Sequence, residues 1–286
     1  MKQILLTGSA GFIGSFFIKK YSKNYNIQTF SFRKNKFEDL IFKSTDTIIH
    51  LSALVHQMSG STQEEYQKVN VTQTIDLAEK AKEFGVKHFI FMSTVKVYGE
   101  ETNITYTEES DCRPEDDYGK SKFKAEQELQ KLEDENFKVS IIRTPIVYGY
   151  GVKANIKNLI SLVKKVPILP FLNIQNKRSM VYVGNLCHLI DILVIKQKSG
   201  IYLAADDNPL STTKLIELIS KSLNKKVFLV KVPFFDKLLN KFKPSFYKRL
   251  YGSLEVNNVI TKKTLGLKNI YSVEEGINYM IHGEVL

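Results

Sequence analysis

The chain has 286 residues, 43% of them hydrophobic, so it can bury a large core in one domain with an added lobe or in two modest domains. Its two cysteines, Cys112 and Cys187, are too few and too widely separated for a disulfide framework or a metal cluster, and we expect no bound metal and a reduced, cytoplasmic location. The net charge of +11 is compatible with nucleic acid, membrane or acidic substrates, but no basic stripe is interleaved with base-stacking aromatics, which argues against nucleic acid.

No apolar run approaches the ~18 residues that a transmembrane helix needs. The longest run, residues 186–195, contains His188 and Asp191. The sequence also enters a predicted strand almost at once, so we expect neither a signal peptide nor a membrane span.

A strand, a glycine turn and a helix are predicted at the start of the chain. Residues 3–7 are an apolar strand, and the turn that follows has the spacing Gly-x-x-Gly-x-x-Gly, one residue wider at its start than the common Gly-x-Gly-x-x-Gly. Gly8 permits the tight turn, Gly11 lets the backbone approach a pyrophosphate, and Gly14 allows close packing of helix on strand. The predicted cofactor contacts here are Gly8, Gly11, Phe12, Ile13 and Gly14.

The end of the second predicted strand, residues 27–32, indicates which dinucleotide is used. An acidic residue at this place binds the ribose 2'-hydroxyl of NAD, whereas a basic residue accommodates the 2'-phosphate of NADP. The strand has no acid, and Ser31, Arg33 and Lys34 stand where the acid would be. We therefore predict NADP as the cofactor, contacted by Arg33, with NAD as the alternative.

Strands and helices alternate along the first half of the chain, which predicts an α/β fold built on a doubly wound parallel sheet. Further strands are predicted near residues 47–51, 88–93 and 139–143, and helices near 12–22, 63–84 and 117–134. After Gly151 the pattern changes. It predicts a helix near 156–165, a strand at 179–183, a helix at 185–196, a strand at 201–205 and further helices to the end.

Tyr118 and Lys122 lie four residues apart on the predicted helix 117–134, so their side chains stack on one face. A cation beside a phenol favours the phenolate, and we expect Lys122 to lower the pKa of Tyr118 toward neutrality, where proton transfer is most effective.

Residues 225–249 concentrate positive charge, with eight basic residues and one acid, Asp236. The same segment is rich in phenylalanine and leucine, and residues 233–242 are typical of a short basic amphipathic helix. One interpretation is peripheral contact with an anionic membrane, at the inner face of the cell membrane, and it raises a lipid-linked pyrophosphoryl sugar as a substrate. The alternative is that these apolar residues pack into the C-terminal part of the fold.

The glycine turn and the Tyr118–Lys122 spacing together resemble the extended short-chain dehydrogenase/reductase family, the NAD-dependent epimerases, dehydratases and reductases of nucleotide sugars. Further landmarks occur in the family's order: Leu51-Ser52-Ala53, Val69-Asn70-Val71, residues 91–99 and residues 143–151. The resemblance implies a Rossmann-type domain over residues 1–150 and a smaller C-terminal substrate lobe over 151–286, with 179–196 returning to the first domain. Residues 35–46 depart from the family, because they leave little room for its usual third strand.

The resemblance also implies roles for particular residues. Thr94, Tyr118 and Lys122 are the catalytic set: Thr94 hydrogen-bonds the substrate oxygen, Tyr118 moves the proton, and Lys122 holds the cofactor ribose. Ser93 is the alternative to Thr94. The remaining cofactor contacts are Leu51, Ser52, Ala53 and Pro145. The substrate contacts are Arg178 on the nucleotide diphosphate, Asn155 on the sugar nucleotide, and His56 in the sugar pocket.

Within the family, the sequence is similar to a branch that acts at C4 of UDP-linked N-acetylhexosamines for bacterial surface polysaccharide. We predict a C4 ketoreductase, because Arg33 favours an exchanging NADPH; a C4 epimerase with retained NAD is the alternative. A dehydratase is disfavoured, since Thr94-Val95-Lys96 lacks the acid pair of that branch. A non-catalytic cofactor sensor is remote, because the catalytic set is complete. Relatives imply a homodimer through helices 63–84 and 117–134.

Overall fold

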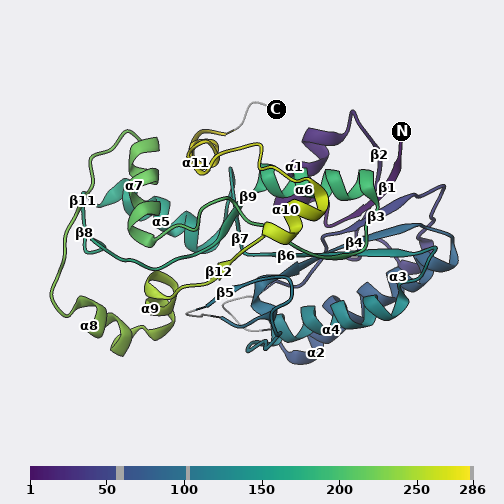
Figure 1. The fold of residues 1–286 in the computed structure, drawn as a ribbon, viewed down its shortest axis with the longest axis horizontal. Coiled ribbons are helices and arrows are strands. Elements are labelled where there is room, and N and C mark those ends of the chain that lie inside the picture. Colours follow the sequence, from purple (N-terminus) through teal and green to yellow (C-terminus); the bar gives the residue numbers. More distant parts are fainter. Residues whose placement is uncertain (56–60, 101–103, 284–286) are drawn as a thin grey trace.

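The computed structural model describes residues 1–55, 61–100 and 104–283, and its centre is a six-stranded sheet (Figure 1). The strand order is β10-β6-β4-β3-β1-β2, and every neighbouring pair is parallel. The strands are β1 (Gln3–Thr7), β2 (Asn26–Phe30), β3 (Thr47–His50), β4 (His88–Thr94), β6 (Lys138–Thr144) and β10 (Gly200–Leu203). The predicted doubly wound α/β fold is confirmed.

Helices cover both faces of this sheet because each buried strand is apolar on both sides. One face carries α1 (Phe12–Tyr21) and α6 (Val183–Lys196), and the other carries α3 (Gln73–Glu83) and α4 (Asp117–Leu132) (Figure 1). Side chains alternate along β4 accordingly. Ile90 belongs to the core under α1 and α6, whereas Phe89 and Phe91 belong to the core under α3 and α4.

Two features between the strands differ from the regular pattern. The sheet ends at β2, and the segment before β3 holds only a short 3₁₀ helix, η1 (Phe37–Asp39), so the predicted lack of a third strand agrees with the structure. The helix predicted at 63–84 is divided in three. A π-helical stretch, η2 (Gln67–Thr72), separates α2 (Gln63–Tyr66) from α3.

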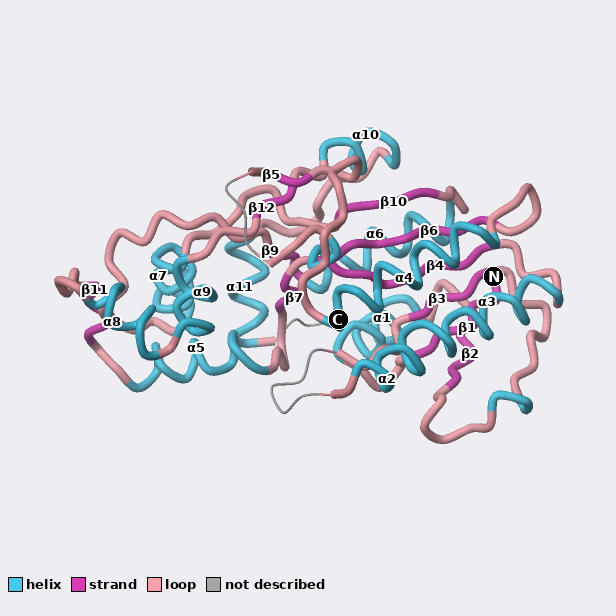
Figure 2. The backbone as a smooth tube through the Cα atoms, turned by 90° about the horizontal axis from the view of Figure 1, so that it is seen from below, coloured by secondary structure: helices cyan, strands magenta, loops and turns pink. Residues whose placement is uncertain are grey.

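The C-terminal half builds a smaller lobe beyond one end of the sheet (Figures 1 and 2). Its helices are α5 (Ala154–Lys165), α7 (Thr212–Ser222), α8 (Phe235–Phe242), α9 (Pro244–Tyr251) and α11 (Val273–His282). Its strand pairs are β7 (Ile146–Tyr148) with β9 (Met180–Tyr182) and β8 (Ile168–Leu169) with β11 (Phe228–Leu229). A third pair joins β5 (Thr105–Tyr106) to β12 (Glu255–Val256), and the short helices η3 (Val95–Val97) and α10 (Val259–Leu265) complete the chain.

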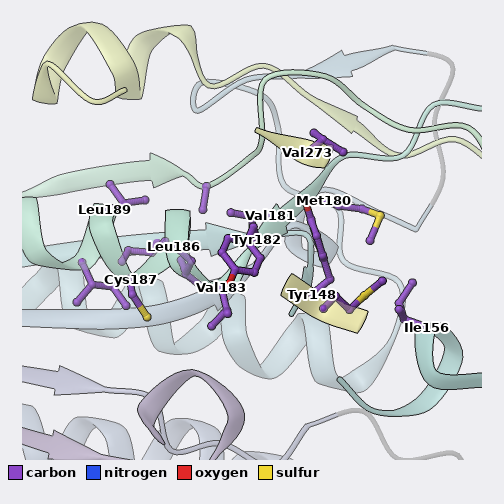
Figure 3. Close-up of a cluster of buried hydrophobic side chains, with 14 of the residues drawn as sticks. Tyr148, Ile156, Met180, Val181, Tyr182, Val183, Leu186, Cys187, Leu189 and Val273 are labelled. Carbon is purple, nitrogen blue, oxygen red and sulfur yellow. The ribbon is translucent and has the colours of Figure 1, made fainter. Parts of the chain in front are cut away.

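Segments of the C-terminal half return to the sheet. Helix α6 packs on α1, and β10 extends the sheet beside β6. One apolar core therefore runs from the sheet into the lobe (Figure 3), where Tyr148 and Tyr182 are fully buried among Met180, Leu186 and Val273. Within the described residues, no helix combines the length and apolarity needed to cross a membrane.

Candidate active site

The glycine turn between β1 and α1 fits only glycine at two of its positions. Gly8 has a φ of +72°, and a Cβ placed there would lie 2.8 Å from Leu51 C and Ser52 N. A Cβ on Gly14 would lie 2.4 Å from the Gly8 carbonyl oxygen. The turn is thus pressed against the backbone that follows β3, which brings two of the predicted cofactor-binding segments together.

Helix α1 begins at this turn without a side-chain cap. Its N-cap is Gly11, and its first turn contains no acidic residue. Backbone N–H groups at such a helix end favour an anion, so the turn fits the pyrophosphate of a dinucleotide. The side chains of Phe12 and Ile13 pack against the apolar core. A cofactor contact by either residue, which stays a prediction, would therefore be made by its backbone.

The end of β2 carries positive charge. Phe30 is buried, whereas Arg33 and Lys34 are exposed in the turn that follows. Phe32 anchors this turn, because its ring packs edge-on against His50 with centroids 6.1 Å apart. Arg33 therefore extends from a fixed turn at the carboxyl edge of the sheet, and the strand has no carboxylate to bind a ribose 2'-hydroxyl.

A chain of hydrogen bonds under the glycine turn was not anticipated from the sequence. The Ser52 backbone N–H donates to Thr7 Oγ1, and Thr7 Oγ1 lies 2.8 Å from His50 Nδ1. His50 Nε2 lies 3.1 Å from Thr74 Oγ1, which donates to the Asn70 carbonyl oxygen. Since the Thr74 hydroxyl is used as a donor, His50 donates from Nε2 and accepts from Thr7 at Nδ1. Burial, together with the charge of Lys122, lowers the pKa of His50 to about 3, so the imidazole is neutral.

Asn70, in the π-helical stretch, joins the loop after β3 to α4. Its side-chain oxygen accepts from the Leu54 N–H at 2.8 Å, and its amide nitrogen donates to the Leu54 carbonyl and to Ser121 Oγ, each at 3.0 Å. π-Helical turns often occur at functional sites. The sequence identified Asn70 only as a landmark. His56 lies outside the described residues.

Helix α4 presents Tyr118, Lys122 and Glu126 at successive four-residue steps. The helix starts at the N-cap Asp116, whose carboxylate accepts from the Gly119 N–H at 2.7 Å. Lys122 is buried, and its Nζ lies 3.8 Å from the centroid of the Phe91 ring on β4. The α4 face that carries the predicted catalytic pair is thus held against the carboxyl half of β4.

The electrostatics of this pair differ from the expectation. Burial raises the pKa of the Tyr118 phenol, and the charge of Asp116 adds to the rise. Burial also lowers the pKa of Lys122 to about 7, against the opposing charge of Glu126. The expected lowering of the Tyr118 pKa by Lys122 is absent, because a low-dielectric site disfavours the charged forms of both groups. The phenol keeps its proton at neutral pH.

Thr94 and Ser93 can be distinguished by their hydrogen bonds. The Ser93 hydroxyl donates to the Glu126 carboxylate, which also receives Arg143 Nη2 at 2.6 Å. Arg143 Nη1 in turn donates to the Tyr98 hydroxyl at 2.8 Å. Ser93 therefore belongs to a buried network behind α4. Within the described residues, the one hydrogen bond found for Thr94 Oγ1 is a long one of 3.3 Å, which it accepts from the Lys96 N–H.

Lys96 lies two residues after Thr94, where the family resemblance predicts an acid in a dehydratase. It forms ion pairs with Glu100, at 2.7 Å, and with Asp116. Burial alone lowers the pKa of Lys96, but the hydrogen bonds and charges of the two carboxylates outweigh it and raise that pKa. A cation is thus fixed beside the N-terminus of α4, the helix that carries the predicted catalytic pair.

The predicted substrate contacts in the second half are tied to α9. Arg178 Nη1 donates to the Gly252 carbonyl at 3.1 Å and to the Lys248 carbonyl at 3.4 Å. Asn155 is exposed, and its side-chain oxygen accepts from Arg249 at 3.2 Å. Pro145 is buried at the junction of β6 and β7. The roles assigned to these residues stay predictions.

A dinucleotide turn beside a tyrosine and a lysine on one helix face defines an NAD(P)-dependent oxidoreductase of the short-chain dehydrogenase/reductase type. The chain belongs to the NAD dependent epimerase/dehydratase family, whose sequence model matches residues 4–205.

Two relatives and one solved structure show which members of this family the chain is similar to. A UDP-glucose 4-epimerase of Vibrio cholerae is 38% identical over 305 aligned residues, which cover 96% of this chain and 93% of that protein. An N-acetyl-alpha-D-glucosaminyl-diphospho-ditrans,octacis-undecaprenol 4-epimerase of Escherichia coli O157:H7 is 27% identical over 81% of this chain and 75% of its own length. The crystal structure of a UDP-glucuronic acid 4-epimerase from Bacillus cereus in complex with NAD has a TM-score of 0.79 at 18% identity and covers 98% of both chains, a likeness of fold.

Proposed function

We propose that this enzyme oxidises and reduces C4 of a UDP-linked hexose or N-acetylhexosamine. The observation that carries the proposal is the position of Tyr118 and Lys122 on one face of α4, against β4 and its terminal Thr94, at the same edge of the sheet as the glycine turn. The 38% identity to a UDP-glucose 4-epimerase along nearly the whole chain supports the sugar-nucleotide substrate and the C4 position.

The residues of the turn fit a dinucleotide, which supplies the hydride acceptor and donor when it is bound. Gly8, Gly11 and the first turn of α1 hold its pyrophosphate, and Lys122 contacts its ribose. Tyr118 moves the proton of the C4 hydroxyl, and Thr94 hydrogen-bonds the same oxygen. Burial raises the pKa of the Tyr118 phenol and favours its protonated form, which is the form that protonates a C4 carbonyl oxygen in the reduction step; in the oxidation step the phenolate accepts the proton of the C4 hydroxyl.

The two candidate activities, C4 epimerase and C4 ketoreductase, differ in how the cofactor is used. A C4 epimerase keeps its cofactor and returns the hydride to the other face of the sugar; the V. cholerae relative supports this activity. A C4 ketoreductase uses exchanging NADPH; Arg33 and Lys34, exposed after an acid-free β2, support that activity. Of the two, we place the epimerase first, because the sequence likeness extends over 96% of the chain whereas the Arg33 argument concerns one turn.

A 4,6-dehydratase is disfavoured by Lys96. Its ammonium is paired with Asp116 and Glu100, so it is held as a cation at a position where that chemistry needs an acid.

Two assays on the same preparation test the proposal. UDP-glucose and UDP-N-acetylglucosamine are incubated without added coenzyme, and the C4 epimers are resolved by NMR. UDP-4-keto-6-deoxy-N-acetylglucosamine is mixed separately with NADPH or NADH, and nicotinamide absorbance is followed. Epimer formation establishes the epimerase, whereas multiple-turnover oxidation of NADPH establishes the ketoreductase and tests Arg33. Inactivity in both would reject the proposal.

Tyr118→Phe is the matched mechanistic control. We expect it to lower turnover by about 10²–10⁴-fold, the range that general acid–base groups contribute. Dinucleotide binding, measured by calorimetry, should stay within about threefold because the hydroxyl is the only group removed. A variant that keeps most of its activity would contradict the mechanism.

Further parts of the proposal concern its setting. We propose a cytoplasmic enzyme of bacterial surface-polysaccharide synthesis, and a homodimer formed through α2–α3 and α4. A lipid-linked pyrophosphoryl sugar is a second candidate substrate, favoured by the E. coli relative and by the basic segment 225–249.

A further inference from the structure

The lobe ends in a surface to which the C4 chemistry itself assigns no role. It comprises the strand β11, the helix α8 and the start of α9, at the end of the lobe farthest from the sheet (Figures 1 and 2). We call it the lobe-end patch. Its exposed apolar residues are Phe228, Val232, Phe234, Leu238, Phe242 and Phe246.

Helix α8 buries only one side of its apolar arc. Phe235 and Leu239 pack against the lobe core, with the Phe235 ring 6.1 Å from that of Phe171. Phe234, Leu238 and Phe242 occupy the adjoining row at four-residue steps, and they are 74%, 58% and 69% exposed. A groove runs alongside this row, lined by residues 232–235, Lys237, Leu238 and Lys241. The fold therefore holds the helix in place with one row and presents the other row to the surroundings.

Phe234 adds an independent observation. Its φ is +60°, in the left-handed region, which is an outlier for a bulky side chain. Such strain persists only where the surroundings impose it and concentrates at functional positions. Here the strained backbone supports a ring that is 74% exposed and forms no part of a core cluster within the described residues.

Positive charge lies directly beside the apolar row. Lys237 Nζ is 5.7 Å from the centroid of the Phe234 ring, and Lys241 Nζ is 5.8 Å from that of Phe242. Residues 225–249 hold eight basic residues and one acid. No ion pair found in the described part of the chain involves any of these basic residues. The patch thus combines uncompensated cations with exposed rings.

We propose that the lobe-end patch binds the surface of an anionic lipid bilayer. Phe234, Leu238 and Phe242 enter the boundary between head groups and acyl chains, and the neighbouring lysines contact lipid phosphates. A second copy of this chain is a poorer occupant, because it would bring an equally positive surface against the first. A nucleic acid offers the phosphates but no apolar layer for three exposed side chains. This inference is independent of which C4 reaction the enzyme performs.

Bilayer binding would also fix the orientation of the active site. Arg249 of α9 donates to Asn155, and the Lys248 and Gly252 carbonyls at the end of α9 accept from Arg178. Both predicted substrate contacts are therefore joined by hydrogen bonds to the end of α9, the helix whose start belongs to the patch. An enzyme seated on the bilayer by α8 would have its substrate lobe nearest the lipid.

Vesicle flotation tests the proposal on the full-length chain. Vesicles of phosphatidylcholine with about 30% phosphatidylglycerol, which give the surface a negative potential that attracts basic segments, are compared with phosphatidylcholine alone at low and high salt. We expect the wild type to float with the anionic vesicles and to bind at least tenfold less to the neutral ones. High salt should weaken the binding.

Two matched variant pairs separate the apolar and the charged contributions. Phe234→Ser/Leu238→Ser/Phe242→Ser should lose at least tenfold in vesicle affinity, whereas Ile41→Ser/Phe84→Ser/Ile195→Ser, at other exposed apolar sites, should bind like the wild type. Lys237→Gln/Lys241→Gln/Lys243→Gln should also lose binding. Lys19→Gln/Lys23→Gln/Lys87→Gln removes the same charge from exposed sites elsewhere and should not. Thermal melts check that all four variants fold.

The absence of tryptophan from the chain provides a local probe. Leu238→Trp places a single tryptophan in the patch, and its emission should shift to the blue on addition of anionic vesicles. Phe84→Trp, exposed at the end of α3, should show no shift. The proposal is overturned if the wild type does not bind anionic vesicles, or if the serine triple variant binds as well as the wild type. A third outcome would also overturn the proposal: no vesicle binding by the wild type, together with self-association, measured by light scattering, that the serine triple variant abolishes. The patch would then bind a second copy of the chain.

Discussion

Glu126 is a single residue that links the stability of the fold to the electrostatics of the site. Its carboxylate is buried, accepts from Arg143 and Ser93, and lies one helical turn beyond Lys122. Replacing a buried ion-pair partner leaves the other charge uncompensated, so Glu126→Gln should lower the free energy of unfolding by about 3–5 kcal/mol. It should also lower the pKa of Lys122 further, because the Glu126 charge raises it. Urea denaturation and the pH profile of kcat measure the two effects.

Glu128→Gln is the control for this residue, two positions along the same helix. Glu128 pairs with an exposed Lys131, an interaction worth below about 1 kcal/mol. Equal losses of unfolding free energy in Glu126→Gln and Glu128→Gln would contradict a larger stabilising contribution from the buried pair of Glu126 with Arg143. The spacing of Tyr118, Lys122 and Glu126 is visible in the sequence, but the Arg143 partner follows from the register of β4 and β6, which pairs Ser93 with Arg143. Sequence periodicity carries no information on that register.

Helix and strand boundaries were largely predictable, because the apolar strands and the capped, amphipathic helices have strong local signals. The division of the helix at 63–84 by a π turn was not predictable. It depends on Asn70, whose side chain bonds Leu54 and Ser121 from two other segments. Likewise the exposed row of α8 has the same composition as its buried row, and only packing distinguishes them.

The elements β1, β3 and α3 are joined by the chain Thr7–His50–Thr74, and this predicts acid sensitivity. The folded-state pKa of His50, about 3, is below its ordinary value of 6.5, so the unfolded state binds more protons between these values. Stability is therefore lost as pH falls below about 6.5. His50 alone accounts for about 2 kcal/mol between pH 7 and 5 by linkage. Urea denaturation at pH 7 and at pH 5 measures the loss of unfolding free energy between them. This loss should be smaller in His50→Gln than in the wild type, by the amount that His50 contributes.

His282→Gln is the control for the acid effect, since His282 is exposed on the last turn of α11. It removes an imidazole that lies outside the Thr7–His50–Thr74 chain. His88, also buried with a pKa lowered to about 3, stays in both variants, so the comparison isolates His50. An unchanged acid response in His50→Gln would mean that the imidazole is not held neutral by the fold.

Across the whole molecule, one buried carboxylate joins the sheet domain to the lobe. Asp206 accepts from the Tyr148 hydroxyl at 2.7 Å, from the Tyr182 N–H at 3.1 Å and from Asn185 at 2.8 Å. These donors lie on β7, β9 and α6, within the core that runs through both parts. The boundary near residue 150 stays a prediction, but contacts of this kind across it lead us to expect a single cooperative unfolding transition.

Asp206→Ala tests this view of the molecule. Removing an acceptor of three buried donors should cost about 2–4 kcal/mol, and it should shift the whole transition without splitting it. Far- and near-ultraviolet circular dichroism, recorded on one urea titration, should therefore remain superimposable at a lower midpoint. Asp207→Ala is the adjacent control, because its pair with Lys262 is exposed and worth below about 1 kcal/mol. Two separate unfolding transitions in Asp206→Ala would instead mean that the lobe and the sheet fold independently and are coupled only through the hydrogen bonds of Asp206.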